Sequence, residues 1–180
     1  MSRSSGGSRE IAVPISVFGS LRRELEKEVG MLPTVRALHH AGYHSGLAAA
    51  AAVDQAAGGN SFDLSQDSFW TRLSMYFSKR GWGTLRHQSA HAGVGILTSV
   101  DWAEATTDEV QADAGCSFST GFLSGLLSQL AGGPIAVLEV GCRTRGADSC
   151  DFAFGSETAI HDLYGHLLDG ADIDSALAAL

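Results

Sequence analysis

The spacing of apolar residues predicts a helical first half of the chain. Apolar side chains recur every three or four residues over Pro14–Gly30, from Thr34 to about Ala57, and over Ser65–Gly81, which is the period of an amphipathic helix. Glycine follows the last periodic residue of each segment, as in the pair Gly58-Gly59, and glycine favours helix C-termini. We therefore expect three helices, preceded by a disordered tail over residues 1–10.

In the second half the period changes to that of a strand and back. Val94–Val100 alternates in the manner of a strand and is expected to pair with the segment around Leu85. Helical spacing returns over Cys116–Leu130, and apolar runs on both sides of the polar turn Arg143–Ser149 predict a hairpin. A last helix begins after Ser156, and the expected buried positions of this helix and the tail are Ile160, Leu163, Tyr164, Leu167, Ile173, Leu177 and Leu180.

These elements predict a single α+β domain over residues 11–180, in which an antiparallel four-stranded sheet is packed with helices. The chain has 180 residues, of which 44% are hydrophobic and 18% charged, so it can form one core but hardly two.

Charge and hydropathy exclude several classes of function. The formal net charge is -8, and Lys and Arg are scattered, which argues against nucleic-acid binding. The first nine residues lack the apolar stretch of a secretory signal, and no apolar run approaches the ~20 residues of a membrane span. We expect a cytoplasmic protein.

Three cysteines and one glutamate are the strongest chemical signal. Cys116 begins a predicted helix, Glu139 and Cys142 lie at the end of a strand, and Cys150 begins the next strand. An odd number of cysteines in a cytosolic chain argues against a disulfide framework and leaves metal ligation, catalysis or simple burial. Three thiolates and a carboxylate can close a tetrahedral zinc site without an open position, which is a structural site.

Strand geometry sets a condition on this site. Positions 139 and 142 have opposite parity and would point to opposite faces of a regular strand. Gly141 permits a bulge that brings both side chains to one side. Arg143 and Arg145, in the turn between the ligands, are candidate donors that would offset the negative charge around the metal.

An aromatic stripe on the third helix is either core or the lining of an apolar pocket. Phe69 and Phe77 are more typical of core, whereas Tyr76 and Trp82 carry polar atoms that a ligand can satisfy. A neutral imidazole near the first hairpin could bond a phenol-like group. The candidate ligand-binding residues are Tyr76, Trp82, His87, Trp102 and Phe69.

Two glycine pairs four residues apart occur in predicted helices, Gly42/Gly46 and Gly121/Gly125. They indicate either a tight dimer contact or close packing within the chain. His40 and His44 share a helix face, but no glutamate lies between them as in a metalloprotease helix. Neither a Ser/His/Asp set nor a nucleotide loop is present, so an enzyme is the less favoured class.

The metal-ligand region resembles a known family. Cys116–Gly125, Pro134-Ile135 leading to Glu139-x-x-Cys142, and Arg145–Phe152 are similar to the 4-vinyl-reductase domain family. The resemblance is specific over residues 99–154, and the family-like core is expected over about 82–168. Members include hydrocarbon-binding proteins, a protein linked to bacteriochlorophyll synthesis, and sensory domains of activators that respond to phenol and alkylbenzenes. Their fold resembles subunits of the TRAPP vesicle-tethering complex.

The resemblance implies a zinc ion held by Cys116, Glu139, Cys142 and Cys150, as in the aromatic-sensing members. It also implies a small-molecule pocket between helices and sheet, which in phenol sensors uses a histidine and a tryptophan upstream of the first cysteine. We expect a binding or sensory module for an apolar or aromatic hydrocarbon, a homodimer through the N-terminal helices, and a separate signalling partner. The alternatives are a TRAPP-like assembly scaffold and an accessory factor in tetrapyrrole vinyl reduction.

Overall fold

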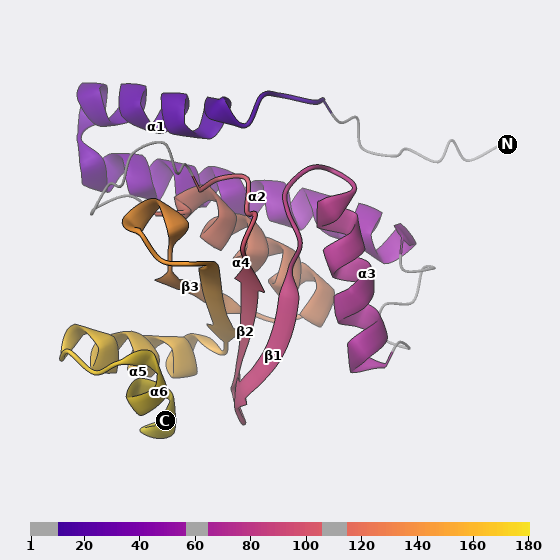
Figure 1. The fold of residues 1–180 in the computed structure, drawn as a ribbon. Coiled ribbons are helices and arrows are strands. Elements are labelled where there is room, and N and C mark those ends of the chain that lie inside the picture. Colours follow the sequence, from indigo (N-terminus) through magenta and orange to yellow (C-terminus); the bar gives the residue numbers. More distant parts are fainter. Residues whose placement is uncertain (1–10, 57–64, 106–114) are drawn as a thin grey trace, which may run out of the picture.

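The computed structural model describes residues 11–56, 65–105 and 115–180, and it confirms an α+β fold with a helical N-terminal half (Figure 1). The predicted tail and the pair Gly58-Gly59 lie outside the described residues. The helices are α1 Ser16–Val29, α2 Met31–Ala56, α3 Gln66–Ser78, α4 Ser117–Ala131, α5 Glu157–Leu168 and α6 Ile173–Ala178, and the strands are β1 Arg86–His91, β2 Val94–Ser99, β3 Ala136–Gly141 and β4 Cys150–Gly155.

The four strands form one antiparallel sheet in the order β1-β2-β4-β3. The inner strands β2 and β4 alternate buried and half-buried residues in the same pattern, so each face of the sheet carries its own core. On one face Leu97 and Phe152 pack with α3 and α4. On the other face Ile96 and Ala153 pack with α5 and α6, which lie on the opposite side of the sheet in Figure 1.

Helix ends follow the sequence in most places. The Ser65 hydroxyl accepts a hydrogen bond from the Ser68 N–H at the start of α3, and Ser156 caps α5 in the same way. The predicted start of the second helix at Thr34 is wrong, because α2 begins at Met31. Proline lacks only an N–H that the first helical turn leaves unpaired, so Pro33 lies within the helix.

The two glycine pairs bring α2 and α4 into backbone contact. An added Cβ would lie 2.0 Å from the Phe118 carbonyl oxygen at Gly42 and 2.0 Å from the His39 carbonyl oxygen at Gly121. Gly46 and Gly125 leave similarly little space, at 2.1 Å. The pairs therefore serve packing within the chain, the second of the two interpretations that the sequence allows.

The last helix differs in one respect from the prediction. Ile160 and Leu163 of α5 are buried and Leu167 is partly buried, but Tyr164 is exposed. The helix buries a narrow stripe against β3 and β4, and Tyr164 lies outside it, where its hydroxyl can reach water. Among the described residues, no helix has the length and apolar character required to cross a bilayer.

Candidate metal centre and aromatic cluster

The four predicted metal ligands converge in the structure. Cys116 is the N-cap residue of α4, Glu139 lies in β3, Cys142 follows β3, and Cys150 begins β4. Their ligand atoms all lie within 4.8 Å of one another, and the three cysteines are buried. The cluster therefore joins the start of a helix to both strands of a hairpin, as the sequence predicts.

The bulge predicted at Gly141 is present. Glu139 pairs with Phe152 while Gly141 pairs with Asp151, so two steps along β3 correspond to one step along β4. An added Cβ at Gly141 would lie 2.5 Å from Oδ2 of Asp151, so glycine also allows this close approach. The extra residue lets Glu139 and Cys142 face the same centre.

The distances fit a tetrahedral metal ion. The Sγ atoms of Cys116 and Cys150 are 3.9 Å apart, and two sulfurs at the usual zinc distance of about 2.3 Å would be separated by about 3.8 Å in a tetrahedron. Three sulfurs and one carboxylate oxygen complete the coordination. The residues present can therefore hold a divalent cation of the zinc type.

Two backbone amides and one arginine support the cluster. The backbone N–H groups of Arg143 and Thr144 donate to the sulfurs of Cys150 and Cys142. The Arg145 guanidinium lies 3.7 Å from Oε2 of Glu139, so this side chain assists the carboxylate. Both carboxylate oxygens of Glu139 also accept from the Cys116 N–H at 3.1 Å. These donors disperse the negative charge that four anionic ligands would place on a metal.

The four acidic groups oppose one another's ionisation. Burial and the nearby Cys142 raise the pKa of Glu139 to about 8. Hydrogen bonds with Cys142 and Cys150 raise the pKa of the Cys116 thiol, and the same contacts lower the pKa of Cys142. Four anions this close together require a cation between them.

A buried carboxylate next to the cluster could not be recognised from the motifs. Glu104 accepts hydrogen bonds from the N–H groups of Phe118 and Ser119 and from the Ser119 hydroxyl, and Oε1 lies 3.7 Å from Nη2 of Arg22. Burial raises the pKa of Glu104. The only sequence signal was an acidic residue close to the start of a helix, where carboxylates cap free N–H groups.

Three predicted ligand-binding residues fall within one aromatic cluster. The Trp82 ring lies 5.7 Å from that of Trp102, and Phe77 lies 5.5 Å from Tyr76 and 5.4 Å from Trp102. Trp102 is 1% exposed, and its Nε1 donates to Oγ of Ser119 at 2.7 Å. These rings lie among α3, α4 and the sheet, and Phe118, Phe122 and Phe152 extend the cluster.

The two other predicted residues belong to a second group of rings. Phe69 packs on Trp70 at 4.8 Å, and His87 is stacked on the same indole at 4.2 Å. The structure therefore divides the five predicted ligand-binding residues between two neighbouring groups, which both contact the core of this sheet face.

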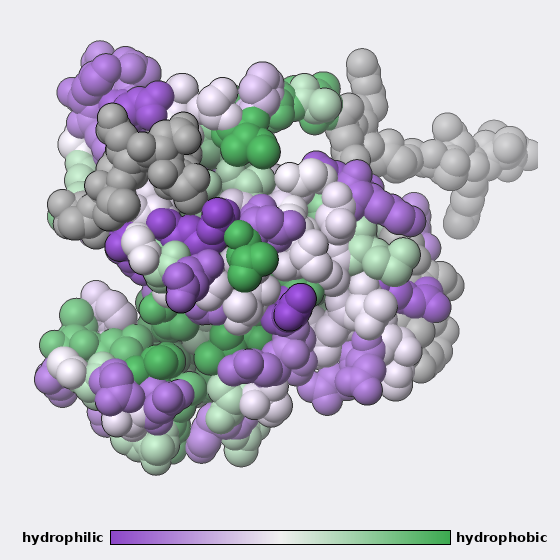
Figure 2. Space-filling view, in the orientation of Figure 1, coloured by the Kyte–Doolittle hydropathy of each residue, from purple (hydrophilic) through white to green (hydrophobic). Residues whose placement is uncertain are grey.

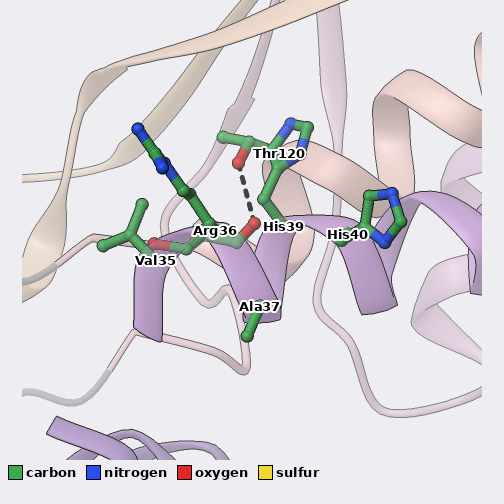
Figure 3. Close-up of a pocket in the computed structure, with 7 residues that line it drawn as sticks. Val35, Arg36, Ala37, His39, His40 and Thr120 are labelled. Atoms are coloured by element: carbon green, nitrogen blue, oxygen red, sulfur yellow. Dashed lines mark hydrogen bonds between the residues drawn. The ribbon is translucent and has the colours of Figure 1, made fainter. Parts of the chain in front are cut away.

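An open hollow lies elsewhere, between α2 and the first turn of α4 (Figure 3). It has a volume of about 590 Å³. Arg36 and His39 extend from α2 on the side where Thr120 of α4 lies, and Thr120 Oγ1 donates to the Ser117 carbonyl at 2.9 Å. No predicted ligand-binding residue lines this hollow.

Comparison with known proteins supports the resemblance. The family model of the vinyl-4-reductase domain matches residues 109–156. No curated protein sequence matches the chain.

Solved structures share the fold at low sequence identity. The phenol-responsive sensory domain of the transcription activator PoxR with phenol has a TM-score of 0.67 at 21% identity, over 91% of this chain and 84% of that chain. Trafficking protein particle complex subunit 3 from Naegleria fowleri, covalently bound to palmitic acid, has a TM-score of 0.64 at 12% identity, over 78% and 91%. A vinyl-4-reductase family protein from Methanocaldococcus jannaschii has a TM-score of 0.51 at 16% identity, over 82% of each chain. The resemblance to the 4-vinyl-reductase domain family is thus confirmed, by the family model over residues 109–156 and by the shared fold over most of the chain.

Proposed function

We propose that this chain is a zinc-containing module that binds a small apolar or aromatic molecule and reports its presence to a partner. The observation that carries the proposal is the direct connection between the metal cluster and the aromatic cluster. Phe152 follows Cys150 by two residues in β4, is fully buried, and lies 5.7 Å from the Trp102 ring. A metal at the cysteines would therefore hold one wall of an aromatic site.

Zinc has a structural role in this proposal. Cys116, Glu139, Cys142 and Cys150 would supply all four ligands, which leaves no position for a reacting water. When bound, the ion would stabilise the contact between the start of α4 and the hairpin. Reduced thiols at this site suit a cytoplasmic protein.

The first helix is the element best placed to report ligand binding. Phe18 of α1 contacts the rings of Trp82 at 5.2 Å and Phe118 at 5.5 Å. A ligand that moves either ring would change the seat of α1. The fold shared with a phenol-responsive sensory domain supports this interpretation.

The surface of the N-terminal segment supports a protein partner. Figure 2 shows apolar residues gathered on the stretch that leads into α1. Monomeric proteins rarely expose large contiguous apolar patches without an interaction. We propose a homodimer through this surface, and its exposed apolar residues are Ile11, Val13, Ile15, Val17 and Leu21.

Native mass spectrometry of protein purified from its own host tests the binding function. We expect a mass increase from one zinc ion per chain and from a small apolar molecule. A chain that carries zinc but never a small molecule would contradict the binding function and leave the metal site standing.

An assembly scaffold is the second candidate. The exposed apolar segment favours it, and a trafficking complex subunit shares the fold. In that case the aromatic cluster would stay filled by its own side chains, and the purified protein would carry a protein partner without a small molecule. A pigment that copurifies with the chain would instead favour an accessory role in tetrapyrrole reduction.

A further inference from the structure

Trp70 of α3 carries a buried hydrogen-bond donor that the fold leaves unused. Its Nε1 is the one buried side-chain nitrogen or oxygen without a hydrogen-bond partner among the residues that the structure describes. Most buried polar groups in folded proteins are satisfied, and a buried donor without a partner costs about 1–3 kcal/mol. The Trp102 indole follows the rule, because it donates to Ser119. The unused donor therefore distinguishes Trp70.

The surroundings of this donor are aromatic. The imidazole of His87 is stacked on the indole, with 4.2 Å between the ring centres and 10° between the planes. Phe69 meets the indole edge to face at 4.8 Å, and Phe154 lies 5.2 Å away. We call these four residues the Trp70 corner. It is built by α3, β1 and β4, so it closes one end of the core between helices and sheet.

Gly95 of β2 sets the position of two of these rings. An added Cβ there would lie 2.5 Å from Cζ of Phe154 and 3.1 Å from Nε2 of His87. Gly95 pairs with Phe154 in the β2–β4 register. Because it has no side chain, both rings can lie directly over the strand.

We propose that the Trp70 corner recognises an oxygen on the ligand, with Nε1 of Trp70 as the donor. The inference rests on the proposed binding function and specifies its ligand: a planar aromatic compound that carries a carbonyl, ether or hydroxyl oxygen. A pure hydrocarbon would leave the donor unpaired. The oxygen-bearing compound is thus favoured by the free energy of one hydrogen bond.

The fold provides a way for such a ligand to enter. His87 belongs to β1, which is at the edge of the sheet and pairs with β2 alone. Its ring can leave the indole without disturbing the central strands, and the ligand ring then takes its place beside Phe69 and Phe154. Burial lowers the pKa of His87, so its neutral imidazole can also accept a hydrogen bond from a ligand hydroxyl.

Acetophenone and cumene are suitable probes, because they have similar shapes and only acetophenone carries an oxygen acceptor. Isothermal titration calorimetry on the purified chain should show several-fold tighter binding of acetophenone. Trp70→Phe keeps an aromatic ring and removes the donor, so it should weaken acetophenone binding about 5- to 10-fold and cumene binding less than about twofold. In ¹⁵N-labelled protein, the indole N–H signal that Trp70→Phe removes should shift downfield with acetophenone and stay in place with cumene.

Two further variants separate recognition from folding. Met75→Leu, at an exposed position of the same helix, should leave both affinities unchanged. Gly95→Ala should weaken both probes, because the added methyl displaces the rings of Phe154 and His87. Circular dichroism establishes that each variant is folded.

The outcomes distinguish this inference from the proposed function. Equal binding of the two probes by the wild type, or an equal loss of both in Trp70→Phe, would overturn the role of Trp70 and leave the binding function intact. If neither probe binds the wild type, the inference and the proposed aromatic-binding function both fail.

Discussion

Arg22 of α1 and Glu104, which lies between β2 and α4, form an ion pair inside the protein. The two side chains are 11% and 2% exposed, and Nη2 lies 3.7 Å from Oε1. The same carboxylate caps the first turn of α4. One buried group thus fastens the first helix to the helix that begins at the metal cluster.

Replacing Arg22 by Met should destabilise the protein at pH 7. The variant keeps an apolar stem but leaves the Glu104 carboxylate without its cation, and breaking a buried pair in this way costs about 3–5 kcal/mol. Urea denaturation measures the change in the free energy of unfolding. Arg23→Met is the matched control, because Arg23 is exposed and contacts Ser20 only at the surface. Equal losses in the two variants would contradict a special role for Arg22.

The pH dependence of stability should change in Glu104→Gln. Burial raises the folded-state pKa of Glu104 above its ordinary value of 4.5. The stabilising contribution of this group is therefore complete below that value and is lost as the pH rises through the folded-state pKa. The free energy of unfolding of the wild type should fall relative to that of Glu104→Gln as the pH rises from about 4.5. Parallel curves would argue against the raised pKa.

Removal of the metal should lower the melting temperature. At free zinc 1,000 times above the dissociation constant, binding stabilises the folded state by about 4 kcal/mol, which corresponds to about 8–16 °C for a domain of this size. Dialysis against a chelator, followed by thermal unfolding with and without added zinc, measures the effect. Cys142→Ser should reproduce the chelated state, whereas Asp148→Asn, an exposed position in the same turn, should behave like the wild type. Unchanged melting in Cys142→Ser would count against structural zinc.

Two glycine substitutions should have opposite effects. Gly121→Ala places a methyl 2.0 Å from the His39 carbonyl oxygen and should destabilise the protein by at least about 2–3 kcal/mol. Gly165 lies within α5 and has nothing within 4 Å of its added Cβ, so Gly165→Ala should stabilise by about 0.5–1 kcal/mol. Thermal unfolding of both variants checks the signs. A neutral Gly121→Ala would show that α2 and α4 can separate at little cost.

The sequence was sufficient for the elements and the metal cluster. Helical and strand periods, serine caps and glycine stops are local signals, so they located the helices and strands to within a few residues. The ligands of the metal cluster could also be predicted, because thiolates and a carboxylate on a hairpin have few other reasons to meet. The parity conflict between Glu139 and Cys142 even indicated the bulge at Gly141, which the strand register confirms.

Long-range relationships could not be predicted. Nothing near Arg22 or Glu104 indicates that they meet, because their contact depends on how α1 lies across the start of α4. The aromatic residues were recognised as a group, but whether each faces Trp102 or Trp70 depends on sheet register and helix rotation. The unused donor of Trp70 could be found only after every other buried polar group in the described part of the chain had its partner.

The backbone contact between α2 and α4 limits the motions that the protein can use. A slide of one helix along the other by a single residue would drive a side chain into the carbonyl that each glycine now faces. These two helices must therefore move as a rigid body or remain still. The freedom to respond to a small molecule is left to α1, α3 and the edge strand β1, which surround this fixed pair.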